Sequence, residues 1–413
     1  MKLSWFIARR ISGAGSGKLT SAGNIIAVLS VAISILVIIV SISVSRGFRR
    51  EVDAKMMAFN GDVTISAMPP TGTNDFTSEQ LSLPPLSARE DILKLPFVTS
   101  FQAISYRPGI LKTEDNLQGV ILKGIDSSFD WSFYSLNLRE GTLPDSDKND
   151  WVVISQRLAD MMKLKCGEGA NFYFVGEHVK VRRLRISAIY SAQLENFDKT
   201  YVLAPRSVVN SLNGWSEDRS SAYIVNFSNH SLSDYYIRKN QIAEAVYSHD
   251  DIEQYLRISG SYEDMSNLVD WLRLLDMNVL IILVLMVAVA AFNMISCVLI
   301  ILFENISSIG ILKSLGMRNG GIKKIFLAKS SGIVLLGLAI GTVVAIVLCL
   351  AEGSLKFIRL NPDNYFINYV PIDISWWSIV GANILSFTVI MLILLIPCHF
   401  ISRIQPSQTI KIK

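Results

Sequence analysis

A glycine-rich stretch near the start of the chain has the residue types of a phosphate-binding loop. It reads Gly-Ala-Gly-Ser-Gly-Lys-Leu-Thr over residues 13–20. Such a loop needs a further glycine five residues before the one that precedes the lysine, and Ser or Thr directly after the lysine to hold magnesium. Ser12 and Leu19 occupy those two positions, and an apolar run follows within a few residues. The stretch therefore predicts a flexible basic flank and not a nucleotide site.

The remaining chemistry-bearing side chains do not predict a catalytic centre or a metal site. The four histidines form neither an HExxH pair nor a Cys/His spacing suited to zinc, and no GxSxG nucleophile motif is present. Spacing alone leaves a catalytic triad open. The formal charge of +4 is too small to indicate a nucleic-acid partner. We expect no catalytic residue, no metal and no cofactor bound by this chain.

The overall composition predicts a membrane protein. Half of the residues are hydrophobic and only 18% are charged, whereas about a quarter are charged in an ordinary soluble domain. Runs of ~20 apolar residues can cross the ~30 Å hydrocarbon core as helices. Four runs qualify, at 25–45, 277–303, 331–352 and 375–398. The first run is too long for a cleaved signal peptide and lacks a cleavage motif, so we expect it to be retained.

The placement of charge predicts how these spans are oriented. Lys and Arg dominate the flank 1–24, the loop 304–330 and the tail 399–413, and such segments prefer the cytoplasm. Both termini are therefore predicted to be cytoplasmic, with 46–276 and the short loop 353–374 outside. Arg46, Arg49 and Arg50 break this rule locally. They precede a long insert, and long domains translocate largely regardless of charge.

Residues 46–276 are the only segment that can fold as a soluble domain. Strand-like alternation and helical periodicity are mixed along it, which predicts an α+β domain of one or two lobes. Strand-like runs lie at 62–67, 98–106, 119–125, 151–154, 171–175, 179–189 and 222–227, and helical patterns at 87–95, 156–162 and 231–246. Helical periodicity also continues past the adjoining spans, which predicts stalk helices, or else interfacial helices, at both ends. The predicted fold class is a membrane protein with four transmembrane α-helices and a large α+β extracytoplasmic domain inserted between the first and second.

The loop between the second and third spans contains a short amphipathic helical pattern. Ile309, Leu312 and Leu315 would form an apolar stripe, Lys313 would lie off that stripe, and Gly316 would end the helix. Such a helix is suited to docking into a groove of a cytoplasmic partner. It could equally lie on the membrane surface, and the pattern alone leaves both interpretations open.

This loop also resembles a known family signature. Residues 304–317 read Glu-Asn-Ile-Ser-Ser-Ile-Gly-Ile-Leu-Lys-Ser-Leu-Gly-Met, similar to the signature of FtsX/MacB-type permeases of ABC transporters. The stretches 185–198 and 365–372 and the overall length resemble the lipoprotein-releasing LolC/LolE branch. The family often has a charged residue where Ser307 stands. Its carrier-docking subunit has a proline-bounded hairpin near 175–183, where this chain has no proline, so the resemblance does not separate the two subunit types.

The resemblance implies a non-catalytic permease subunit in a bacterial inner membrane. ATP and magnesium would be bound by a separate LolD-like ATPase dimer. A second permease, identical or paralogous, a lipoprotein substrate, membrane lipid and a LolA-like periplasmic carrier would be the other partners, with no nucleic acid. ATP binding would move the helix 307–317, and the first two spans would carry the displacement outward. The implied coupling residues are Glu304, Ile309, Gly310, Leu312, Lys313, Leu315, Gly316 and Met317.

Two further groups of residues follow from this interpretation. Moving acyl chains from lipid to water costs ~0.8 kcal/mol per CH₂, so release needs an energy input and an apolar receiver. Apolar residues at the outer ends of the spans are the predicted acyl-chain contacts: Val40, Val44, Phe48, Leu275, Val279 and Phe366. Gly337 and Gly341 form a small-xxx-small pattern that predicts close helix packing.

The sequence leaves two alternatives to lipoprotein release open. One is another FtsX/MacB-type mechanotransmission permease, which exports peptides or antimicrobials or regulates cell-wall hydrolases. The other is a membrane-anchored sensor or adhesion module without transport activity. An ATPase-docking helix separates the transporters from the anchored module, because the module has no use for one.

Overall fold

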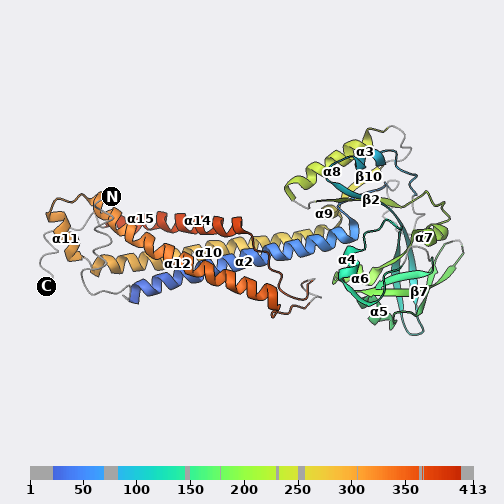
Figure 1. Cartoon of the computed structure of the whole chain (residues 1–413), viewed down its shortest axis with the longest axis horizontal. Helices are drawn as coiled ribbons and strands as arrows, with labels where there is room; N and C mark the ends of the chain where they lie inside the picture. The colour runs from blue at the N-terminus through green and yellow to red at the C-terminus, as the bar shows by residue number, and fades with distance from the viewer. Residues whose placement is uncertain are drawn as a thin grey trace. The chain divides into compact units, whose positions relative to one another are not determined.

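The computed structural model describes residues 22–68, 82–144, 149–176, 178–228, 232–249, 256–304, 306–361, 365 and 367–400. The chain divides into two compact units (Figure 1). The helical unit comprises Met1–Arg50, Trp271–Arg359 and Tyr369–Lys413, and the sheet unit comprises Glu51–Asp270 and Leu360–Asn368. Two of the boundaries fall inside single uninterrupted helices, α2 (Ala22–Asn60) and α10 (Ser266–Glu304). Each of these helices therefore contributes residues to both units.

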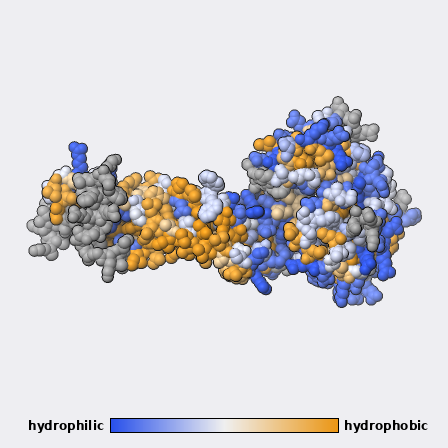
Figure 2. Space-filling view, in the orientation of Figure 1, coloured by the Kyte–Doolittle hydropathy of each residue, from blue (hydrophilic) through white to orange (hydrophobic). Residues whose placement is uncertain are grey.

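Within the described residues, four helices are long and apolar enough to cross a membrane. They are α2, α10, α12 (Asn319–Leu355) and α14 (Trp376–Ile393), the last followed by α15 (Leu395–Phe400). Only 22–39% of each apolar window is buried inside the chain, and Figure 2 shows apolar side chains over the visible surface of the helical unit. Apolar surface on this scale requires lipid or another chain to cover it. The four apolar helices predicted from hydropathy are confirmed.

The sheet unit is built on one mixed ten-stranded sheet. The strand order is β10-β1-β9-β2-β3-β8-β5-β7-β4, and β6 pairs with β2 and β7. The strands are β1 (Val63–Ala67), β2 (Val98–Lys112), β3 (Leu117–Ile125), β4 (Leu138–Gly141), β5 (Trp151–Ser155), β6 (Gly169–Phe174), β7 (Lys180–Tyr190), β8 (Tyr201–Pro205), β9 (Ala222–Phe227) and β10 (Leu256–Gly260). Most pairs are antiparallel, but β3 with β8 and β5 with β7 are parallel. The unit combines helices and strands, as the predicted α+β domain does, and its sheet is mixed.

The long strand β2 joins two lobes of the sheet unit. Its first half pairs with β9, and β9 with β1, whereas its second half pairs with β3 and β6. We call the part around β1, β9 and β10 the first lobe and the part around β3–β8 the second lobe. Figure 1 shows α3 and α8 at the first lobe and α5 and α6 at the second. The helices are α3 (Arg89–Leu93), α4 (Ser132–Leu136), α5 (Gln156–Met162), α6 (Glu195–Thr200), α7 (Arg206–Asn213), α8 (Leu232–Tyr247) and α9 (Ser261–Asp264).

Candidate functional site

The last turns of α2 are enclosed by the second lobe. Val52 and Met56 are fully buried, and Phe59 is 3% exposed. The Phe59 ring packs against four aromatic rings at centroid distances of 5.3–6.4 Å. We call the enclosing residues the α2 socket: Lys123, Phe133, Tyr134, Tyr190, Gln193, Phe197 and Asp198. The helix end is thus embedded in the second lobe as part of its core.

A buried lysine contacts the carboxyl end of this helix. Lys123 of β3 is 2% exposed, and its Nζ donates a hydrogen bond to the carbonyl oxygen of Phe59. Carbonyls in the last turn lack partners within the helix and form the negative end of its dipole, so a cation is favoured there. Burial lowers the pKa of Lys123 from 10.5 to about 7. The contact therefore links a central strand to the end of α2 despite the cost of burying an ammonium group.

The segment between β7 and α6 contacts the same helix. Gln193 adopts a left-handed backbone with φ +65°. Its N–H donates to Asp198 Oδ2 at 2.8 Å, and its Oε1 accepts from Lys55 Nζ of α2 at 2.8 Å. Burial raises the pKa of Asp198 to about 6 and lowers that of Lys55 to about 8. A strained backbone of this kind costs ~1–3 kcal/mol and persists only where its surroundings hold it in place. The stretch 185–198, noted for its resemblance, thus supplies contacts to α2.

The two residues that follow α2 are bonded to the first lobe. Gly61 turns the chain with φ +67°. The Asp62 carboxylate accepts from the N–H of Phe227 in β9 at 2.7 Å. Its carbonyl accepts from the hydroxyl of Tyr235 in α8 at 2.6 Å and from the N–H of Ser261 in α9 at 3.1 Å. The end of α2 is therefore held by the second lobe and the residues after it by the first. If this helix end moved, the movement would therefore act on both lobes.

Within the helical unit, the three arginines after the first apolar run all contact aspartates. Arg49 Nη2 lies 3.0 Å from Asp276 Oδ2 on α10. Arg46 Nε and Arg50 Nη1 lie 3.6 and 3.4 Å from the two oxygens of Asp373, in the segment before α14. These side chains are partly exposed, so each pair contributes about 0–1 kcal/mol. The sequence identified the arginines as exceptions to the charge rule but not their partners, which lie far along the chain.

The predicted coupling segment forms α11 (Ile306–Ser314) and a tight ending. Gly316 has φ +88°, and the N–H of Met317 donates to the carbonyl of Leu312 at 3.0 Å. This is the glycine-terminated ending expected of a short helix. Leu312, Lys313 and Met317 are half-buried. The side chain of Glu304, the last residue of α10, lies outside the described residues.

The predicted apolar stripe on α11 is divided between two environments. Ile309 is 1% exposed and belongs to the same buried cluster as Ile322 and Phe326 of α12, and Gly310 is also buried. Leu315 is 77% exposed, and Ile311, which the sequence reasoning missed, is 58% exposed. Within this chain the outward apolar surface therefore consists of Ile311 and Leu315. Ile309 instead connects the segment to α12.

Five of the six predicted acyl-chain contacts lie on two helices, α2 and α10. Val40, Val44, Leu275 and Val279 are half-buried, and Val40 packs against the core of the helical unit. Phe48 is 8% exposed and its ring lies edge-on to Trp271 at 6.2 Å. Phe366 lies outside the described residues. The most exposed apolar side chains at the corresponding end of α10 are residues that were not predicted: Leu274, Met277 and Ile281, each at least 60% exposed.

The two glycines of the third apolar run lie against α2. A Cβ added at Gly337 would lie 2.8 Å from Cβ of Val31, and one added at Gly341 would lie 2.8 Å from Cα of Ala32. Real Cβ atoms do not approach this closely, so α12 and α2 can pack at this distance only with glycine at both positions. Small residues allow such close approach between membrane helices.

Comparison with known proteins covers nearly the whole chain. Residues 25–254 match the MacB-like periplasmic core domain, and residues 280–406 match the FtsX-like permease C-terminal family. The lipoprotein-releasing system transmembrane protein LolC of Xylella fastidiosa (strain Temecula1) is 19% identical, with 93% of this chain and 92% of that protein covered. LolE of Haemophilus influenzae is 20% identical, with 92% of each covered. The periplasmic region of MacB from Actinobacillus actinomycetemcomitans is 18% identical, covers 50% of this chain and 92% of its own, and has a TM-score of 0.35.

Proposed function

Because the chain belongs to the LolC/LolE family of FtsX/MacB-type permeases, we propose that it extracts lipoproteins from the outer leaflet of the inner membrane and passes them to a periplasmic carrier. The family and the four apolar helices indicate a multi-pass membrane subunit of an ABC transporter. ATP would be hydrolysed by a separate cytoplasmic ATPase dimer, and a second permease would complete the membrane core. The observation that carries the proposal is α2, one unbroken helix that contains the first apolar run and whose last turns are enclosed by the α2 socket.

In this proposal both termini and α11 are cytoplasmic. The sheet unit is periplasmic, as an insert between the first and second spans. The spans keep the boundaries expected from the sequence, at 25–45, 277–303, 331–352 and 375–398. The basic loop around α11 supports this orientation, because Lys and Arg prefer cytoplasmic loops. The ion pairs of Arg46, Arg49 and Arg50 support it too, since partnered arginines can stand on the outer side.

The cycle starts at α11. Closure of the ATPase dimer moves α11 through the exposed side chains of Ile311 and Leu315, which suit an apolar groove on the partner. The buried contact of Ile309 with α12 passes the movement on, and the close packing of Gly337 and Gly341 passes it from α12 to α2. The α2 socket then transmits the movement to the sheet unit.

The energy requirement agrees with an ATP-driven step. Exposing one acyl chain with about fifteen methylene groups would cost roughly 12 kcal/mol. The receiver must therefore shield the chain while it leaves the membrane. We assign this role to apolar residues at the outer ends of α2 and α10. The candidates are the predicted Val40, Val44, Phe48, Leu275, Val279 and Phe366, together with the more exposed Leu274, Met277 and Ile281.

Depletion of the protein followed by membrane fractionation tests the substrate class. Lipoproteins destined for the outer membrane should accumulate in the inner membrane. If they reach the outer membrane normally, the assignment of lipoprotein release is wrong. Export of peptides or control of a cell-wall hydrolase then becomes the better assignment.

A second experiment tests the docking surface. Ile311→Asp and Leu315→Asp should each abolish co-purification of the ATPase, because a charge cannot enter an apolar groove unpaired. Leu136→Asp is the matched control, since Leu136 is 86% exposed on α4 of the sheet unit. Undiminished ATPase binding by both variants would remove α11 from the interface without affecting the substrate class.

A further inference from the structure

Two arginines on one face of α2 share a single carboxylate. Arg46 and Arg50 are four residues apart, so their side chains lie one turn apart on the helix, where like charges repel each other. Arg46 Nε lies 3.6 Å from Oδ2 of Asp373, and Arg50 Nη1 lies 3.4 Å from Oδ1. Arg49 is paired separately, with Asp276 on α10. Two guanidiniums against one carboxylate leave this group with an excess of one positive charge.

The shared carboxylate is held in place by the backbone around it. The N–H of Asp373 donates to the carbonyl of Ser43 on α2 at 3.1 Å. A Cβ added at Gly47 would lie only 2.9 Å from the backbone nitrogen of Ile372, so the segment before α14 passes directly against α2. The position of Asp373 relative to the two arginines is therefore set by the packing of this segment on the helix.

Both guanidiniums can be reached from outside the protein. The side chain of Arg46 is 49% exposed and that of Arg50 is 78% exposed. Each guanidinium has five N–H donors, and their contacts with Asp373 occupy only part of this set. Glu51, the next acidic residue of α2, interacts with Lys55 one turn further along. Because exposed ion pairs contribute only about 0–1 kcal/mol, a second anion can compete for these donors.

Two tryptophans place Arg46 at the depth of the lipid headgroups. Trp376 and Trp377 are the first residues of α14 and are 66% and 87% exposed. The next residue, Ser378, accepts a hydrogen bond from Arg46 Nη1 at 3.0 Å. Tryptophan is enriched where a membrane helix meets the headgroup layer. This layer contains the phosphates of phospholipids, and a guanidinium can bind a phosphate through two parallel N–H···O bonds.

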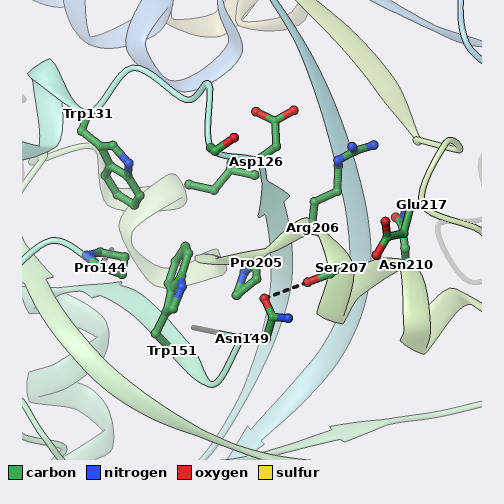
Figure 3. A pocket seen from close by; sticks show the side chains of 12 residues that line it. Asp126, Trp131, Pro144, Asn149, Trp151, Pro205, Arg206, Ser207, Asn210 and Glu217 are labelled. Atoms are coloured by element: carbon green, nitrogen blue, oxygen red, sulfur yellow. Dashed lines mark hydrogen bonds between the residues drawn. The ribbon is translucent and has the colours of Figure 1, made fainter. Parts of the chain in front are cut away.

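Arg206 of the sheet unit has the opposite balance of charge around it. It lines a cavity of about 250 Å³ together with Asp126 and Glu217, and Figure 3 shows these side chains. Two carboxylates and one guanidinium give the lining an excess of negative charge, which disfavours an anion. An arginine at an accessible surface is therefore not enough for phosphate binding, and the positive excess distinguishes the pair on α2.

We propose that Arg46 and Arg50 bind the phosphate group of a phospholipid, which bridges the two guanidiniums. The phosphate supplies the negative charge that Asp373 alone does not provide. Its acyl chains extend toward the apolar run of α14, while the phosphate stays at the level of Trp376 and Trp377. In the orientation proposed above this lipid belongs to the outer leaflet. The proposal requires only that α2 and α14 stand in a membrane, so it does not depend on which substrate is released.

Native mass spectrometry of the full-length protein in detergent tests this assignment. The probe is dioleoyl phosphatidylglycerol, and the matched probe is dioleoylglycerol, which has the same acyl chains and no phosphate. Arg46→Gln combined with Arg50→Gln should weaken the phosphatidylglycerol adduct roughly tenfold or more, because charge-assisted hydrogen bonds are lost. Arg206→Gln is the control and should leave the affinity unchanged. Asp373→Asn removes the competing carboxylate and should strengthen binding roughly threefold or more.

Three outcomes would overturn the proposal. The first is an unchanged affinity for phosphatidylglycerol in the double arginine variant. The second is equal binding of dioleoylglycerol by the wild type, which would mean that the acyl chains alone are recognised. The third is complete displacement of the lipid by about 10 mM inorganic phosphate, which would mean a site for free phosphate. If the double variant fails to fold, Asp373→Asn decides, because unchanged or weaker binding there contradicts competition for the two arginines.

Discussion

Lys123 of β3 donates a hydrogen bond to the carbonyl oxygen of Phe59, the residue before the last of α2, and is buried where it does so. This bond connects α2, the helix that contains the first apolar run, to a central strand of the mixed sheet. Together with the bond from Lys55 of α2 to Gln193, it is one of two polar contacts described between this helix end and the otherwise aromatic α2 socket. Lysine is costly to bury, so its presence there calls for a role that an apolar residue could not perform.

Lys123→Met should separate ATP hydrolysis from release. The variant keeps the volume of the side chain but loses a charge-assisted hydrogen bond of ~1.5–3 kcal/mol, so lipoprotein released per ATP should fall roughly 10- to 100-fold. ATP turnover of the assembled transporter should stay near the wild-type value. Reconstitution in proteoliposomes with the proposed ATPase and the proposed second permease measures both quantities. Val120→Ala is the control, since Val120 is a buried core residue of the same strand. If that control lowers the release-to-ATP ratio equally, general destabilisation explains the effect.

The same lysine should make stability depend on pH. Its pKa falls from 10.5 to about 7 on folding, so the unfolded chain holds more protons than the folded chain between these values. Stability should therefore rise with pH from about 7 to 10.5, by at most ~1.4 kcal/mol per pH unit. Lys123→Met lacks this contribution, so the free energy of unfolding of the wild type relative to the variant should increase toward alkaline pH. Urea unfolding at pH 6.5, 8 and 9.5 measures the difference, and a flat difference would mean that Lys123 is not desolvated.

Substitution of Gln193 should reveal the strain in its left-handed backbone. Gln193→Ala removes the side-chain acceptor for Lys55 and keeps the backbone strain. Gln193→Gly removes the same acceptor and also the strain, because glycine adopts a positive φ freely. The glycine variant should therefore be more stable than the alanine variant by about 1 kcal/mol, although glycine normally destabilises folded chains. Thermal unfolding of the two variants side by side measures this. A more stable alanine variant would show that this backbone is not strained.

Adding a side chain at Gly341 should separate α12 from α2. A methyl group there would come within 2.8 Å of the Ala32 backbone, so Gly341→Ala should destabilise the helical unit by ~1–3 kcal/mol. Gly353→Ala is the matched control on the same helix, because an added Cβ there meets no atom within 4 Å. In micelles, the midpoint of thermal unfolding should be lower than that of the wild type for Gly341→Ala and unchanged for Gly353→Ala. Equal midpoints would contradict close packing of these helices.

The sequence predicted seven of the ten strands in the described part of the chain. All seven predicted runs fall on strands, because each shows alternation or a long β-branched run. β4, β8 and β10 were missed. Four of the five residues of β8 are buried, so it has no alternation and is too short to recognise as a buried strand. The helical pattern predicted at 231–246 forms α8, in which Ile242 and Val246 are buried and Ile237 is 59% exposed.

The α2 socket could not be predicted from the sequence. Its contacts join residues far apart in the chain: Lys123 and Phe59 are separated by 64 positions, and Lys55 and Gln193 by 138. Only the pairing of the mixed sheet brings them together. Helical periodicity likewise gave an apolar stripe on α11, but it could not show that Ile309 packs inward while Leu315 remains exposed.

The arginine–aspartate pairs of the helical unit have a consequence for biosynthesis. Ser45, which directly precedes Arg46, donates a hydrogen bond to Asp276, and Asp276 lies 231 positions further along the chain. Asp373 lies 323 positions after Arg50. At ~5–20 residues per second, synthesis reaches the aspartates roughly ten seconds to a minute after the arginines. Arg46, Arg49 and Arg50 of α2 are therefore synthesised well before the aspartates with which they pair. These pairs can form only after the aspartates have been made, so they belong to a late step of assembly.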